Sequence, residues 1–364
     1  MKLKFLLPLA LALLVYSCTS KTKSKEGVNI ENDLVLSGTI VTDSISILDE
    51  DNELLGQISS MAFITKSKFV VATKAGSIVT YNLMGERVGG FSNIGTGPYE
   101  YVSPGKIKIY DNRIYLWCSQ LLKLIVFDLE GNPIQEYTKF STAIKDFVVV
   151  DNKIYFYMSG GSLYSLIEVY DLNTQKSIAF HGEEDRSSEI LSMLSCSGGL
   201  AINNGNIYFS PVGQLKIESI KNGSIIMQKS LVDNEFRVTE LDNVNYGKLR
   251  DDIEARVNYV NQNSYVGGIF IINNQIVIKT DVGQFVYDNV WDSKTWNISK
   301  RYEKYFILDE ELNLIATYKR PFSLNCKNCL YAENSENLYF LTEVEKANGD
   351  DYEYQLNKLV FDSK

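Results

Sequence analysis

A short phrase recurs along this 364-residue chain: two apolar residues, a polar turn that usually contains Asn, then an apolar residue and often Tyr. Asn tolerates the positive φ that a tight turn requires, so each copy predicts a β-hairpin. Six hairpins at roughly regular intervals predict an array of β-units. The copies are residues 63–70, 109–115 (IYDNRIY), 149–155 (VVDNKIY), 201–208 (AINNGNIY), 271–277 (IINNQIV) and 331–339.

A second set of turns follows the first, each between two apolar runs. These turns are residues 81–85 (YNLMG), 127–131 (FDLEG), 170–173 (YDLN), 218–223 (ESIKNG) and 308–313 (LDEELN). Two hairpins per repeat give four strands, which is the blade of a propeller. The sequence therefore predicts an all-β fold, a six-bladed β-propeller of four-stranded antiparallel blades that occupies residues 33–364 as a single domain.

The ring must also close. Residues 33–48 contain three short apolar stretches before the first hairpin. We expect part of this segment to add a strand to the last blade, beside residues 359–361, because that pairing leaves no exposed sheet edge.

Two segments interrupt the repeat. In the first, Leu249, Ile253, Val257 and Val260 are spaced by four, four and three positions. This spacing predicts a short amphipathic helix at about 246–260, across the connection between blades four and five.

The second interruption, residues 281–305, is rich in aromatic side chains. Trp and Tyr combine rigid contact area with polar edges, so these rings are candidates for a binding surface. The alternative is that they pack the insertion onto blade five. The candidate residues are Tyr287, Trp291, Trp296 and Tyr302.

The N-terminus has the features of a secretory signal: Lys2 and Lys4, then an apolar stretch, 5–15, that is too short to span a bilayer. It ends in residues 15–18 (VYSC), which resemble a bacterial lipobox. The resemblance implies cleavage before Cys18 and a lipid on its thiol. The alternative is an ordinary secretory peptide with an incidental cysteine.

On the lipobox interpretation, residues 1–17 are a signal peptide and 18–32 a polar, flexible tether. Several acyl chains, such as palmitate, would anchor the protein stably to a membrane of the bacterial envelope. The outer membrane is expected, with a lean to its periplasmic side. Losing residues 1–17 changes the formal charge from −9 to −11. An acidic chain without a basic run argues against nucleic acid as a partner.

Residues 91–101 (FSNIGTGPYEY) and 124–131 (LIVFDLEG) resemble the NHL-type repeat, and more closely the six-bladed propeller lipoproteins of Gram-negative envelopes. In that family a Gly-x-Gly-Pro-x-Glu-Tyr/Phe loop joins successive blades, and residues 95–101 match it. Residues 117–119 (WCS) stand where NHL repeats carry an Asp, so NHL recognition chemistry is not transferred. The glycines of this loop are expected to turn the chain, and not to bind phosphate.

The resemblance and the absence of an assembled catalytic set favour a lipid-anchored binding module for a small ligand or an envelope protein. The alternative comes from other six-bladed propellers, the lactonases, which hold a divalent metal in the central channel. Residues 183–185 (EED) could offer oxygens to Ca²⁺, but a solvated acidic loop is favoured. No catalytic, metal or cofactor residue is assigned.

Cys326 and Cys329 form a lone CxxC. A zinc site would need two further ligands, and the chain has a single histidine. An oxidising compartment makes a local disulfide and a pair of free thiols equal alternatives. Cys118 and Cys196 are expected to be small buried residues.

Overall fold

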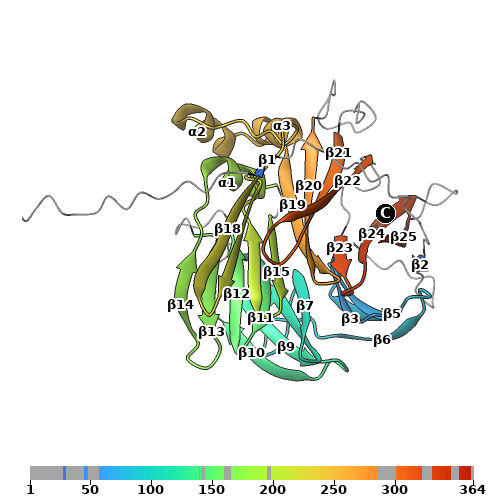
Figure 1. The fold of residues 1–364 in the computed structure, drawn as a ribbon. Coiled ribbons are helices and arrows are strands. Elements are labelled where there is room, and N and C mark those ends of the chain that lie inside the picture. The colour runs from blue at the N-terminus through green and yellow to red at the C-terminus, as the bar shows by residue number, and fades with distance from the viewer. Residues whose placement is uncertain are drawn as a thin grey trace, which may run out of the picture.

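The computed structural model contains six blades arranged in a ring (Figure 1). It describes residues 28–29, 45–47, 57–138, 140, 144–159, 165–194, 198–284, 301–321, 330–345 and 352–361. Each blade has four antiparallel strands, and consecutive strands of the chain are hydrogen-bonded neighbours. The predicted six-bladed β-propeller is confirmed.

The blades follow the chain in order. Blade 1 comprises β3 (Ile58–Thr65), β4 (Lys68–Thr73), β5 (Ser77–Asn82) and β6 (Arg87–Ser92). Blade 2 comprises β7 (Lys106–Tyr110), β8 (Arg113–Cys118), β9 (Lys123–Asp128) and β10 (Pro133–Thr138). Blade 3 comprises β11 (Ile144–Val150), β12 (Lys153–Met158), β13 (Ile167–Asp171) and β14 (Lys176–His181). Blade 4 comprises β15 (Gly199–Asn203), β16 (Asn206–Ser210), β17 (Lys216–Lys221) and β18 (Ser224–Val232). Blade 5 comprises β19 (Tyr265–Ile272), β20 (Gln275–Gly283), β21 (Arg301–Leu308) and β22 (Leu314–Pro321). Blade 6 comprises β23 (Leu330–Glu333), β24 (Leu338–Glu345), β25 (Tyr352–Leu359) and β2 (Ile45–Ile47).

The Asn-centred turns behave as the sequence predicts. In blades 2, 3 and 5, both central residues of the first hairpin have positive φ, as a tight two-residue hairpin turn requires. These residues are Asp111, Asn112, Asp151, Asn152, Asn273 and Asn274. Their role is to adopt the backbone conformation of the turn, so the repeated Asn residues are turn formers.

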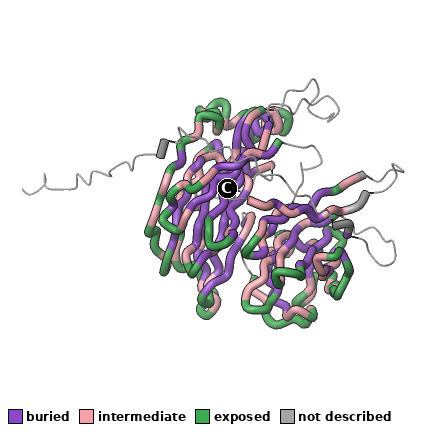
Figure 2. The backbone as a smooth tube through the Cα atoms, turned by 45° about the vertical axis from the view of Figure 1, so that its right-hand side comes forward, coloured by how far each residue is buried: buried purple, intermediate pink, exposed green. Residues whose placement is uncertain are grey.

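Apolar side chains seal the ring between adjacent blades. Six hydrophobic clusters each join one pair of neighbouring blades. One of these pairs is blade 6 with blade 1, so the ring is closed by apolar contacts. The first strand of every blade contacts the first strand of the next around the whole circle. The buried backbone in Figure 2 accordingly runs through the blades, while the turns are exposed.

The N-terminal segment closes the last blade. Strand β2 pairs antiparallel with β25, with Ile45 opposite Leu356 and Ile47 opposite Tyr354. The expected closing strand is confirmed, although it lies beside residues 354–356 and not 359–361. Ile47 is 3% exposed and packs in the cluster that joins blade 6 to blade 1.

We expect Ile47→Ala to lower the free energy of unfolding by about 2–5 kcal/mol, because it leaves a cavity in the closing interface. Ile225→Ala is the matched control, since Ile225 also lies on an outermost antiparallel strand but is 43% exposed. Urea unfolding of both variants checks the prediction. Equal losses in the two variants would show that β2 adds nothing to ring closure.

Three helices lie together at one end of the ring (Figure 1): α1 (Arg186–Ser192), α2 (Asn243–Asp251) and α3 (Ile253–Gln262). The predicted helical insertion around 246–260 is confirmed, and it consists of two helices, α2 and α3. The helical segment is broken at Asp252, whose side chain caps α3 by accepting a hydrogen bond from the Ala255 N–H at 3.0 Å. Ile253 is 58% exposed, so the apolar stripe is not continuous.

The structure describes two residues of the segment expected to be a tether, 18–32. Val28 and Asn29 form β1, which pairs parallel with the end of β18 as a fifth strand of blade 4. The other residues of this segment, Cys18 among them, lie outside the described residues.

The Gly-x-Gly-Pro loop turns the chain from blade 1 to blade 2. The Gly97 N–H donates to the Glu100 carboxylate at 2.7 Å. That carboxylate fills the space where a Cβ on Gly95 would stand, so a side chain at this position would require Glu100 to move. Tyr101 is fully buried and donates a hydrogen bond to the Gly76 carbonyl at 3.0 Å. The expected structural role of these glycines is confirmed.

Candidate functional site: the central channel

A cavity of about 690 Å³ lies where the first strands of the six blades converge. Its lining comes from the beginnings of these strands, with residues of β3, β7, β11, β15, β19 and β23. Tyr265, the first residue of β19, lines the cavity and also packs against the helix cluster. The cavity therefore lies toward the end of the ring that carries the helices.

Three of the first strands carry a β-bulge where they line the channel. The pairing register shifts at Ser59 in β3, at Lys145 in β11 and at Gly267 in β19. In each case the extra residue and the one after it both line the cavity, as Lys145 and Asp146 do. The bulges therefore lie in the channel wall, and in β19 the two glycines contribute backbone only.

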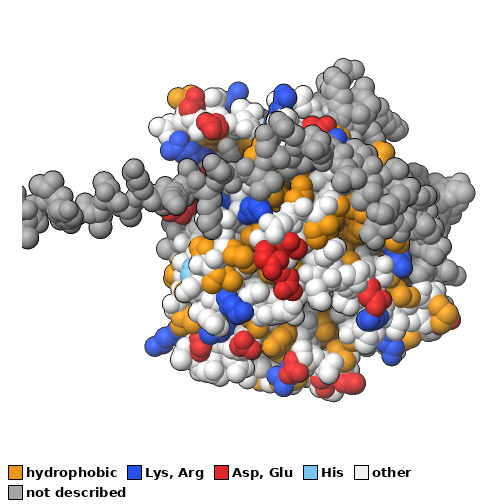
Figure 3. All heavy atoms as spheres, viewed as in Figure 1, with side chains coloured by type: hydrophobic (Ala, Val, Ile, Leu, Met, Phe, Trp, Pro, Cys, Tyr) orange, Lys and Arg blue, Asp and Glu red, His pale blue; other side chains and the backbone are white. Residues whose placement is uncertain are grey.

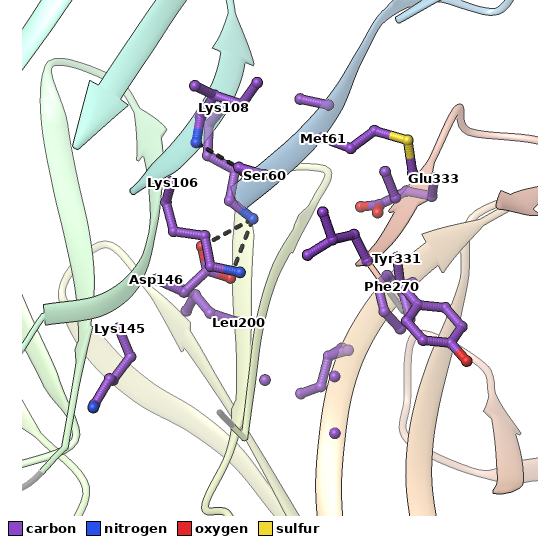
Figure 4. Close-up of a pocket in the computed structure, with 18 of the residues that line it drawn as sticks. Ser60, Met61, Lys106, Lys108, Lys145, Asp146, Leu200, Phe270, Tyr331 and Glu333 are labelled. Carbon is purple, nitrogen blue, oxygen red and sulfur yellow. Dashed lines mark hydrogen bonds and ion pairs between the residues drawn. The ribbon is translucent and has the colours of Figure 1, made fainter. Parts of the chain in front are cut away.

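Charged groups from blades 2, 3 and 6 meet in the channel (Figure 4). The Lys108 Nζ lies 3.1 Å from an Asp146 carboxylate oxygen. Burial opposes the charge of Lys108, but Asp146 and Glu333 outweigh it and raise the pKa of this lysine. Lys106, two residues earlier on the same strand face, has a lowered pKa because burial and the charge of Lys108 outweigh the attraction of Asp146.

We expect Lys106 and Lys108 to titrate in opposite directions from the ordinary lysine value, Lys106 below it and Lys108 above it. NMR titration of ¹³C-dimethylated lysines, assigned with Lys→Arg variants, measures both in one sample. Asp146→Asn should lower the pKa of each lysine, because the carboxylate stabilises both charges. The same titration midpoint for both lysines would contradict this description of the channel.

A buried ionic network supports the wall of the channel that blades 5 and 6 form. Glu303, 1% exposed, lies 2.6 Å from Arg320 Nε and 3.3 Å from Lys279 Nζ. It also accepts hydrogen bonds from the hydroxyls of Tyr305 at 2.7 Å and Tyr331 at 2.5 Å. Lys279 and Tyr331 line the cavity, so this network fixes two groups of the channel wall.

Further hydrogen bonding links Lys279 to Asp281, whose carboxylate lies 2.6 Å from the ammonium. Burial favours the neutral amine of Lys279, but Asp281 and Glu303 outweigh it and raise the pKa. Burial likewise disfavours the charge of Glu303, but Lys279 and Arg320 outweigh it and lower the pKa. Each group is therefore held in its charged form by its partners.

The residues proposed from sequence lie elsewhere or are not described. Tyr302 lies on β21, with the Lys319 Nζ 5.0 Å from its ring centre. Cys118 is fully buried with a free thiol, as expected. Asp185 of the acidic loop caps α1 by accepting from the Ser188 N–H at 2.8 Å. The remaining candidates, Tyr287, Trp291, Trp296, Cys196, Cys326 and Cys329, fall outside the described residues.

Sequence reasoning missed the residues of the channel. Lys106 and Lys108 alternate with Ile107 and Ile109 in β7, which shows only that one face of this strand is polar. The signal that could have found them is that β7 begins its blade and therefore lies beside the ring axis. Within the described part of the chain, no three His, Cys, Asp or Glu side chains are placed to hold a metal ion.

A known family has this architecture: residues 28–300 match the 6-bladed beta-propeller family DUF5128. The match spans well over half of the chain. The chain belongs to this family. No curated protein matches the sequence of this DUF5128 propeller.

Solved structures with the same fold include two from Bacteroides. A member of the DUF4221 family from Bacteroides vulgatus is 13% identical, with a TM-score of 0.62, over 89% of this chain and 99% of that one. A protein of Bacteroides fragilis described as exported is 12% identical, with a TM-score of 0.59, over 93% and 98%. At these identities, the likeness concerns the fold alone.

Proposed function

We propose that this DUF5128 propeller is a lipid-anchored envelope protein that binds a small ligand or a protein partner in its central channel. The observation that supports this most is the cavity itself, into which all six blades contribute residues. Its volume of about 690 Å³ is typical of ligand sites. The bulged strands and the network around Glu303 hold polar groups in place around it.

The proposed location rests on the lipobox-like residues 15–18 and on the Bacteroides fragilis neighbour described as exported. None of the helices in the described residues is long and apolar enough to cross a membrane. In the proposal, lipid on Cys18 supplies the attachment to the membrane.

The channel chemistry gives the lactonase alternative no support. Asp146 and Asp281 each have a lysine as their nearest charged partner, at 3.1 and 2.6 Å. A divalent cation would have to displace these ammonium groups, and Lys106 would repel it further. The described carboxylates of the channel therefore suit ion pairing with lysine better than metal ligation.

A thermal-shift screen of small metabolites and oligosaccharides tests binding in the channel. Lys145→Trp places an indole in the cavity from a side chain that makes no hydrogen bond or ion pair with any described residue. Lys176→Trp is the control, because Lys176 is exposed on the outermost strand of blade 3. The proposal expects ligands that raise the Tm of the wild type and of Lys176→Trp but not of Lys145→Trp. Ligands that stabilise all three proteins equally would contradict a channel site.

A further inference from the structure

The channel is cationic within an acidic protein. The formal net charge of the chain is −9. The face drawn in Figure 3 shows acidic and basic side chains interspersed, without a basic patch. The cavity, in contrast, is lined by five lysines and three carboxylates, namely Lys74, Lys106, Lys108, Lys145 and Lys279, with Asp146, Asp281 and Glu333. Walls of low dielectric strengthen the field of such a cluster.

The carboxylates already neutralise some of these lysines. Lys108 is paired with Asp146, and Lys279 with Asp281 and Glu303. Lys106 makes no hydrogen bond or ion pair with any residue that the structure describes. Asp146 is close enough to attract its charge, but Asp146 is bound to Lys108. Lys106 is thus a partly buried cation that an incoming anion would stabilise.

The third carboxylate lies on a different wall of the channel from Lys106. Glu333, on β23, lies across the channel from Lys106 and Lys108 (Figure 4). Burial raises its pKa, and the nearby Asp146 acts in the same direction, while Lys108 opposes both.

Apolar groups provide room for the body of a ligand. Met61, Phe270 and Tyr331 line the side of the channel opposite Lys106 (Figure 4). Aromatic and thioether groups of this kind pack against an aliphatic chain or the face of a sugar ring. The cavity therefore offers apolar surface as well as cationic groups.

We propose that Lys106, with Lys108 beside it, binds the anionic oxygen group of a small organic molecule whose body lies against Phe270 and Tyr331. A carboxylate and a phosphate share the required chemistry. This inference rests on the proposed use of the channel as a binding site and specifies the ligand class.

Isothermal titration calorimetry at low ionic strength tests it with citrate, glucose 6-phosphate and neutral glucose. We expect both anions, or one of them, to bind the wild type at least about tenfold more tightly than glucose. Lys106→Met should weaken this binding by about tenfold or more, and Lys106→Arg should retain it within about threefold. Lys176→Met is the matched control, because it removes the same charge at an exposed site.

The outcomes separate the inference from the proposed function. Tighter binding of citrate identifies a carboxylate site, and tighter binding of glucose 6-phosphate a phosphate site. Equal binding of the three probes, no binding of either anion, or equal losses in Lys106→Met and Lys176→Met would overturn the inference. A neutral ligand that stabilises the wild type but not Lys145→Trp would then leave the proposed function standing.

Discussion

Glu303→Gln is expected to lower the free energy of unfolding by about 3–5 kcal/mol, because it removes the carboxylate that two buried cations share. Lys279 and Arg320 both pair with Glu303, and their side chains are only 6% and 7% exposed. An amide keeps the shape of the side chain but not its charge. Urea or guanidinium unfolding at pH 7 measures the loss.

Glu343→Gln is the matched control, because Glu343 is an exposed residue of β24. Its effect should stay within about 0.5 kcal/mol. Equal stability of the two variants would show that the network around Glu303 is not a stabilising feature.

The same carboxylate predicts a dependence on pH. The folded-state pKa of Glu303 is lowered, so its contribution is fully present above the unfolded pKa of about 4.3 and is lost as the pH falls through the folded value. Between about pH 5 and about pH 3, where carboxylates titrate, the stability of the wild type should fall more steeply than that of Glu303→Gln. Parallel slopes would contradict the lowered pKa.

Cys18→Ala is expected to abolish incorporation of a clickable fatty-acid analogue into the protein in cells. The lipid-anchor proposal places all acylation on the residue that follows the signal peptide, and the alanine has no thiol to modify. Ser20→Ala, two residues later, should label as the wild type does. Gel fluorescence of the immunoprecipitated protein measures the label. Unchanged labelling of Cys18→Ala would refute the anchor.

The repeats could be predicted from sequence because each has a local cause. Asn112 and Asn152 occupy positive-φ turn positions, and that requirement is visible without knowledge of distant contacts. Four strands per repeat could be predicted by counting the turns. Closure by an N-terminal strand could be predicted because an exposed sheet edge must be covered. The break at Asp252 was less visible, because the apolar spacing of Leu249 and Ile253 continues across it.

The channel could not be predicted because it is assembled from all six blades. Lys106 and Asp146 are 40 positions apart in the numbering, and only the ring arrangement of the blades brings them to one cavity. Glu303 meets Lys279 across neighbouring strands, but Tyr331 reaches it from the next blade. The aromatic insertion, 281–305, drew attention because it breaks the repeat, whereas most channel residues lie on the regular strands of the repeat.

Site-specific photo-crosslinking in living cells tests the central claim, that the channel is the recognition site, most directly. A p-benzoylphenylalanine residue is introduced in place of Lys145, inside the channel, or of Lys176, on the outermost strand of blade 3. The proposal predicts a discrete adduct from position 145, resolved by mass spectrometry as a ligand or a partner protein, and none from position 176. Adducts from position 176 alone, or the same adducts from both positions, would contradict it.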